Sequence, residues 1–151
     1  MTVSVEIETH IARPPADVFA ALIDVERYPS WLIASGIVRV ERADPEPLAV
    51  GSRLVISQTV AGRSTVLDGA VTSLAPGRAF GLRGKDKDGV TIEIDAALAP
   101  DGPGTSLRWS LRLKLPLRFR MFESMVAPQA KNAAALDLEA LRRRLESVAP
   151  A

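Results

Sequence analysis

The fold is decided near the end of the chain, by residues 117–148, which read LRFRMFESMVAPQAKNAAALDLEALRRRLESV. Apolar side chains recur there every three or four residues, which is the spacing of one stripe along an α-helix. A helix of about thirty residues is roughly 45 Å long and needs a large apolar surface to cover this stripe. Pro128 lies within the run and should kink the helix or split it in two. The stripe consists of Phe119, Phe122, Val126, Ala130, Ala134, Leu138, Leu141 and Leu145.

The chain before this helix alternates apolar and polar residues, which is the pattern of half-buried β-strands. Prolines after the first alternating stretch favour two short helices, at about 15–23 and 25–31. The charged residues 85–89 are expected to form a solvated hairpin tip, and Gly69 is expected to mark a bulge. We expect strands at residues 3–11, 37–42, 54–60, 64–74, 79–83, 90–98 and 107–115.

This order of elements predicts an α+β fold in which a curved antiparallel sheet wraps around the C-terminal helix, within a single domain of residues 1–151. A strongly bent sheet and a straight helix cannot touch along their whole length, so side chains or a ligand must fill the gap. Apolar pockets of this kind typically enclose about 300–1,000 Å³. We expect the gap to be lined by Trp31, Val38, Ile56, Phe80, Leu82, Ile92, Ile94, Trp109, Leu111, Phe122 and Val126.

A few polar residues fall on or near these apolar faces. Gln58 shares a strand face with apolar neighbours, where it could orient a ligand or bond to nearby backbone. Glu123 lies within the helix stripe; burial would raise its pKa and make it a candidate acid or base, whereas a kink at Pro128 would expose it. We expect Asp137, at the edge of the stripe, to be solvated, and His10 to lie on a wet strand face.

Composition excludes several classes of function. The chain has 151 residues, 47% of them apolar, which suffices for one sizeable core. Its net charge of +1 provides no global field to recruit nucleic acid. The chain has no cysteine and one histidine, so we expect no metal site, no cofactor and no covalent nucleophile such as a cysteine thiolate. No apolar run is long enough to span a membrane and the start does not resemble a signal peptide, so we expect a cytoplasmic protein.

Several motifs together resemble the START-like superfamily, also written SRPBCC, and within it the polyketide cyclase/dehydrase and lipid-transport group. The resemblance implies a helix-grip fold, in which a seven-stranded antiparallel sheet encloses an apolar cavity with the C-terminal helix. It also implies binding of lipids, sterols, polyketides or hormones, although the fold does not fix the function. The motifs are Ile11-Ala-Arg-Pro-Pro-Ala-Asp-Val-Phe19, Leu22-Ile-Asp24, Tyr28-Pro-Ser-Trp31, residues 50–54, residues 71–76 and residues 138–146.

Three functions remain open at this point. The first is a carrier or sensor that binds a small apolar or amphipathic molecule, such as a lipid, polyketide or phenolic, without catalysis. The second is a cyclase or dehydratase that positions its substrate in a dry pocket, with Gln58 or Glu123 as its polar group. The third is a regulatory protein-interaction module, which would need an exposed apolar patch beyond the pocket mouth. The chain could be a monomer or a homodimer.

Overall fold

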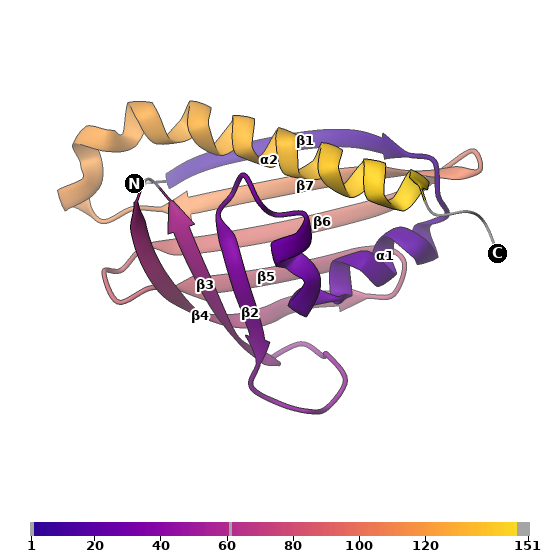
Figure 1. The fold of residues 1–151 in the computed structure, drawn as a ribbon, viewed down its shortest axis with the longest axis horizontal. Coiled ribbons are helices and arrows are strands. Elements are labelled where there is room, and N and C mark those ends of the chain that lie inside the picture. The colour runs from indigo at the N-terminus through magenta and orange to yellow at the C-terminus, as the bar shows by residue number, and fades with distance from the viewer. Residues whose placement is uncertain (1, 61, 148–151) are drawn as a thin grey trace.

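A long C-terminal helix, α2 (Glu123–Ser147), lies against a curved seven-stranded antiparallel sheet (Figure 1). The computed structural model describes residues 2–60 and 62–147. The architecture confirms the predicted α+β helix-grip fold. Val148, at the end of the expected helix, lies outside the described residues.

The sheet is a meander with one long crossover. Its strand order is β1-β7-β6-β5-β4-β3-β2, so β1 and β2 form opposite edges although they are neighbours in sequence. Paired residues form a continuous apolar row on the inner face, because Leu111 lies opposite both Val5 and Ile94, and Ile94 lies opposite Leu82. The strands are β1 (Thr2–Ile11), β2 (Ile37–Arg42), β3 (Arg53–Val60), β4 (Arg63–Ala75), β5 (Ala79–Lys85), β6 (Thr91–Asp101) and β7 (Gly104–Lys114).

The bulge expected at Gly69 is wrong. Gly69 pairs regularly with Leu54 on one side and with Gly84 on the other. The register instead shifts between Val71 and Ser73, where β4 pairs with β5. Gly69 has no side chain and so interrupts the apolar–polar alternation of the sequence, but its backbone pairs regularly with both neighbouring strands.

A second bulge lies in β2, between Ile37 and Arg39. The extra residue puts Ile37 and Val40 on the inner side of the sheet together, so strict alternation fails. Val38 is therefore on the outer side, with 57% of its surface exposed.

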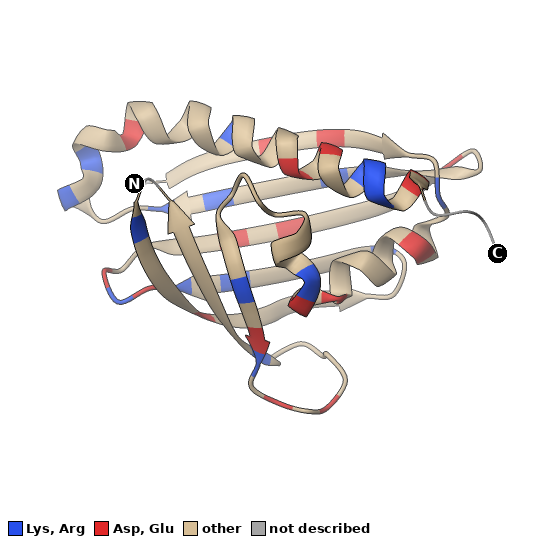
Figure 2. Cartoon of the chain, viewed as in Figure 1, with Lys and Arg blue, Asp and Glu red and all other residues tan. Residues whose placement is uncertain are grey.

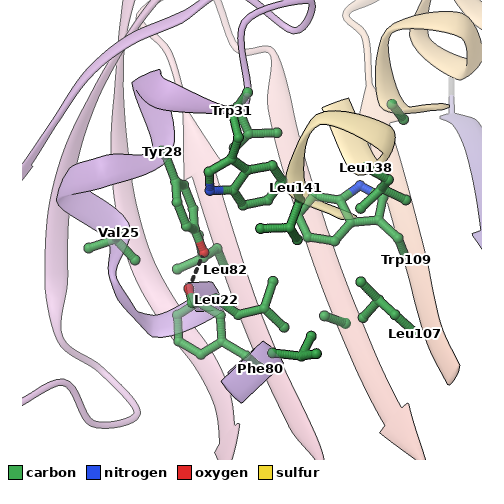
Figure 3. Close-up of a cluster of buried hydrophobic side chains, with 14 of the residues drawn as sticks. Leu22, Val25, Tyr28, Trp31, Phe80, Leu82, Leu107, Trp109, Leu138 and Leu141 are labelled. Carbon is green, nitrogen blue, oxygen red and sulfur yellow. Dashed lines mark hydrogen bonds between the residues drawn. The ribbon is translucent and has the colours of Figure 1, made fainter. Parts of the chain in front are cut away.

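The crossover between β1 and β2 contains α1 (Pro15–Ile23) and a 3-10 helix, η1 (Val25–Ser30). Pro15 starts α1, as its fixed φ angle favours, and α1 packs on β5, β6 and β7. The main core lies here, between these helices, the sheet and the second half of α2 (Figure 3). Among its members are Leu22, Val25, Tyr28, Trp31, Phe80, Leu82, Leu107, Trp109, Leu138 and Leu141.

Tyr28 anchors this core through its hydroxyl group, which donates a hydrogen bond to the carbonyl oxygen of Leu22 (Figure 3). Burial, with a smaller contribution from the nearby Asp24 carboxylate, raises the pKa of Tyr28, so the phenol stays neutral. The Trp31 ring packs edge-on between two other rings, 5.3 Å from the centre of Tyr28 and 5.8 Å from that of Trp109.

Pro128 does not split the long helix, because α2 runs through it. The change in backbone occurs earlier, where a 3-10 helix, η2 (Leu117–Phe122), passes into α2 at Glu123. Only about one turn of α2 precedes Pro128, so its missing N–H removes a bond from a short terminal stretch rather than from the helix interior.

The turn between β5 and β6 is not simply a solvated tip, as expected from its charges. Asp86 is buried, and its Oδ1 accepts hydrogen bonds from the backbone N–H groups of Asp88 (2.9 Å) and Val90 (3.0 Å). The buried carboxylate thus closes the turn from inside, and Asp88 remains available to pair with Arg63 and Arg118.

Candidate functional site

A cavity of about 390 Å³ lies between the inner face of the sheet and the first half of α2. Its size falls within the range of about 300–1,000 Å³ that is usual for small-molecule sites. Strands β3 to β7 supply one wall, α2 supplies the other, and the loop between η1 and β2 supplies a third side.

The cavity exists because α2 carries small side chains at this level. Ala130, Ala133 and Ala134 face the sheet where larger residues would fill the gap. Further along the same helix, Leu138 and Leu141 are buried and reach the core. The change from alanine to leucine along one face of α2 therefore determines where the space between helix and sheet ends.

Most of the residues expected to line the gap do so. Their role in binding a ligand stays a prediction, because lining the cavity does not by itself show contact with a ligand. The expected residues that the structure brings together around the cavity are Ile56, Gln58, Leu82, Ile92, Ile94, Trp109, Leu111 and Val126.

Four expected residues lie elsewhere. Trp31 and Phe80 are buried in the core beside α1 and outside the cavity lining, because that end of the gap is filled. Val38 is turned outward by the bulge in β2. Phe122 belongs to the 3-10 turn before α2, which has a different period from the α-helix that the stripe assumed, and it is 49% exposed.

The lining also contains residues that we did not expect to face the cavity. Ala130 and Ala134 belonged to the helix stripe, and Val60 and Leu113 continued faces already recognised, so a signal for these four was present. The loop residues carried no periodic signal at all. The additional lining residues are Leu32, Ala34, Ser35, Ile37, Val60, Leu67, Gly84, Leu113, Gln129, Ala130, Ala133 and Ala134.

Asp137 on α2 holds the loop that closes this third side. Its carboxylate accepts hydrogen bonds from the backbone N–H groups of Ala34 (2.8 Å) and Ser35 (2.9 Å). The residue is only 2% exposed, so the expectation that it would be solvated is wrong. Burial raises the pKa of Asp137, and the hydrogen bonds oppose that rise.

The same loop is fixed to β3 from its other side. The Nε2 of Gln58 donates a hydrogen bond to the carbonyl oxygen of Ser35 over 2.9 Å, so the backbone bond that we weighed against a ligand role is present. Gly36 has φ = 76° and lies so near β3 that a Cβ there would be 2.0 Å from the carbonyl oxygen of Thr59. Glycine is therefore required at this close approach.

The amide oxygen of Gln58 is the other hydrogen-bonding group of this side chain. Within residues 2–60 and 62–147, no donor is placed to hydrogen-bond to it. The other lining side chains that carry polar atoms are Ser35, Gln129 and Trp109, and none of the described lining residues is ionisable. The cavity can thus accept or offer hydrogen bonds at a few points, but it offers no countercharge.

The remaining polar candidates lie away from the cavity. Glu123 is half-buried in the first turn of α2 and is not part of the lining. His10 is exposed, and its Nδ1 lies 3.0 Å from a carboxylate oxygen of Asp101. In the part of the chain that the structure describes, no group of three His, Cys, Asp or Glu side chains could hold a metal ion.

A curved antiparallel sheet that grips a C-terminal helix around an apolar cavity defines the class of START-like, helix-grip proteins. Within this class, the chain belongs to the polyketide cyclase/dehydrase and lipid transport family, whose sequence model matches residues 2–146. A search of curated proteins finds no match.

Solved structures with the same fold come from several bacteria. A protein of Thermus thermophilus is 17% identical, with a TM-score of 0.79 over 97% of this chain and 99% of that one. The Zhui aromatase/cyclase of a Streptomyces species is 17% identical, with a TM-score of 0.78 over 97% and 94%. A START superfamily protein of Mycobacterium smegmatis is 21% identical, with a TM-score of 0.78 over 97% and 99%. At these identities the likeness shows the fold alone.

Proposed function

We propose that this protein binds a small apolar or amphipathic molecule, such as a lipid, polyketide or phenolic, between the sheet and α2, and acts as its carrier or sensor. The observation that carries the proposal is the cavity of about 390 Å³ with an almost wholly apolar wall. Family membership supports it, because the family description includes lipid transport.

The chemistry of the wall narrows the ligand class. An ionised group inside the cavity would lose its hydration and meet no charged partner among the described lining residues, so the buried part of the ligand is neutral. A hydroxyl group on the ligand can donate to the amide oxygen of Gln58. Burying about 300 Å² of apolar ligand surface contributes roughly 7 kcal/mol before association costs, which is compatible with micromolar affinity.

The experiment is a binding titration with N-phenyl-1-naphthylamine, a neutral probe that fluoresces in apolar sites, against the wild type and two phenylalanine variants. Ala130→Phe places a ring in the cavity and should weaken binding by about tenfold or more, since most of the buried probe surface is displaced. Ala135→Phe adds the same ring on the exposed face of α2 and should leave the affinity unchanged. Absence of probe binding to the wild type, or equal weakening by both variants, contradicts the proposal.

A cyclase or dehydratase is the second candidate, and the free amide oxygen of Gln58 in an otherwise apolar wall is the observation that favours it. Such an enzyme would fold a flexible chain against the wall and use Gln58 to orient one oxygen-bearing group. With a synthetic polyketide thioester as substrate, turnover that Gln58→Leu abolishes and Glu123→Gln preserves would support it. Absence of any cyclised or dehydrated product would reject it.

A further inference from the structure

Four large apolar side chains are exposed beside the cavity, in and just after η2. Leu117 is 77% exposed and Met121 78%, and Phe122 and Met125 are also exposed. We call these four residues the η2 patch. Phe122 precedes the cavity residue Val126 by four residues, and Met125 precedes the cavity residue Gln129 by four, so the patch lies about one turn before the cavity lining. Val60, which also lines the cavity, is 47% exposed, and its paired residue Arg63 reaches the ring of Phe119 in η2, so this side of the cavity wall comes to the surface beside η2.

The patch lies in the most basic part of the chain. Residues 112–131 contain five Lys or Arg and one acidic residue, Glu123, which gives this segment a net charge of +4. Since the whole chain carries +1, all its other residues together carry −3. Figure 2 shows basic segments at the η2 end of the molecule. The basic residues are Arg112, Lys114, Arg118, Arg120 and Lys131.

Three of these five basic residues are already paired. Arg112 and Lys114 lie 3.7 Å and 3.8 Å from carboxylate oxygens of Glu93, and Arg118 helps to hold η2 in place. Arg118 lies 3.7 Å from a carboxylate oxygen of Asp88 and 5.0 Å from the ring centre of Phe119. The guanidinium of Arg63 approaches the same ring to 5.7 Å. Arg120 and Lys131, in contrast, are exposed and pair with no acidic side chain in the described part of the chain. Their charges are available to a partner.

We propose that the η2 patch docks on an anionic lipid surface. A bilayer interface offers acyl chains to the patch and acidic headgroups to Arg120 and Lys131, which matches both features of this surface. A second copy of the chain fits less well, because a two-fold contact through the patch would bring together, from both copies, the cations Arg120 and Lys131, which are unpaired within the described residues. No helix in residues 2–60 or 62–147 could span a membrane, so the contact is at the surface of the bilayer.

Docking here would let an apolar ligand pass between the bilayer and the cavity with little exposure to water. That purpose rests on the proposed function, but the docking itself does not. The two can be tested separately, because vesicle binding needs no ligand. Ala130→Phe, which fills the cavity, leaves the η2 patch and its charges intact.

The test is flotation of the purified protein with vesicles of phosphatidylcholine, with and without phosphatidylglycerol. We expect binding to the anionic vesicles that weakens with added salt and is unaffected by Ala130→Phe. The double substitution Arg120→Gln with Lys131→Gln should weaken it about 25-fold, at about fivefold per charge. Met121→Ser should weaken it by roughly tenfold through lost apolar insertion.

Matched controls remove the same groups elsewhere. Arg53→Gln with Arg78→Gln removes two exposed charges far from η2, and Leu136→Ser removes an exposed apolar side chain from α2; both should bind vesicles like the wild type. Thermal melts establish that each variant is folded. The proposal is overturned if anionic vesicles do not bind the wild type, if the controls weaken binding as much as the patch variants, or if sedimentation equilibrium shows a dimer that Met121→Ser dissociates.

Discussion

Asp137→Ala should be among the most damaging single substitutions on α2, although the residue is polar. It removes a buried carboxylate that accepts two backbone hydrogen bonds, at 2.8 Å from Ala34 and 2.9 Å from Ser35. Leaving a buried donor without its acceptor lowers the free energy of unfolding by about 1–3 kcal/mol, and by more when the lost acceptor is charged. Ala34 is exposed, so water can replace its partner, and Ser35 is half-buried. We therefore expect a total loss of about 2–3 kcal/mol in the free energy of unfolding.

The assay is equilibrium urea unfolding followed by tryptophan fluorescence, which reports on Trp31 and Trp109 in the core beside this loop. A loss of 2–3 kcal/mol corresponds to a melting temperature lower by about 5–10 °C for a chain of this size. Asp44→Ala, in an exposed loop, is the control and should change the stability by less than about 0.5 kcal/mol. If the two variants are equally stable, Asp137 does not hold the loop.

The pH dependence gives a second test of the same group. Because burial raises the pKa of Asp137 above its ordinary value of 3.8, the folded state binds the proton more tightly than the unfolded state between these two pKa values. Asp137 therefore contributes more stability at low pH, and this part is lost as the pH rises through that window. The cost of Asp137→Ala should grow as the pH falls from neutral and then level off below about 3.8. A cost that shrinks on acidification would mean that the hydrogen bonds outweigh burial.

Two further substitutions test the same side of the cavity. Gly36→Ala should lower the free energy of unfolding by more than about 3 kcal/mol, because it adds a clash with the carbonyl oxygen of Thr59 to the roughly 1–2 kcal/mol of strain at a positive φ. Gly77, with φ = 71° and open space around it, is the control, and Gly77→Ala should cost only the strain. Equal losses of the two variants in urea unfolding would refute the close approach at Gly36. Gln58→Leu should weaken the binding of 1-naphthol by about two- to tenfold relative to naphthalene in parallel titrations, the worth of one hydrogen bond, and an unchanged ratio would show that the amide does not contact the ligand.

The fold could be predicted from the sequence because its signals are local and repeated. Alternation along each strand gave the meander, and the stripe from Val126 to Leu141 gave the helix that the sheet covers. Proline at position 15 marked the start of α1. The apolar lining from β5 to β7 followed from the same alternation, because every second residue of a strand points to the inner face of the sheet.

The rest could not be predicted because it depends on contacts between distant segments. Alternation cannot reveal that a bulge turns Val38 outward, because the extra residue only shows once β3 is paired with β2. Asp137 looked solvated because its partners are backbone N–H groups about a hundred residues away, which have no sequence signature. Asp86 looked solvated because the sequence shows only its charged neighbours, whereas its carboxylate also contacts Arg63 and Thr65 of β4, more than twenty residues away.

The proposed binding function requires that the space beside Ala130 and Ala134 accept a neutral apolar molecule. A crystal structure of the protein soaked with N-phenyl-1-naphthylamine would show whether this space is occupied. We expect density for the probe between α2 and the inner face of the sheet, against Ile94 and Trp109. Side chains that fill this space, or a probe bound only on the outer surface, would contradict it.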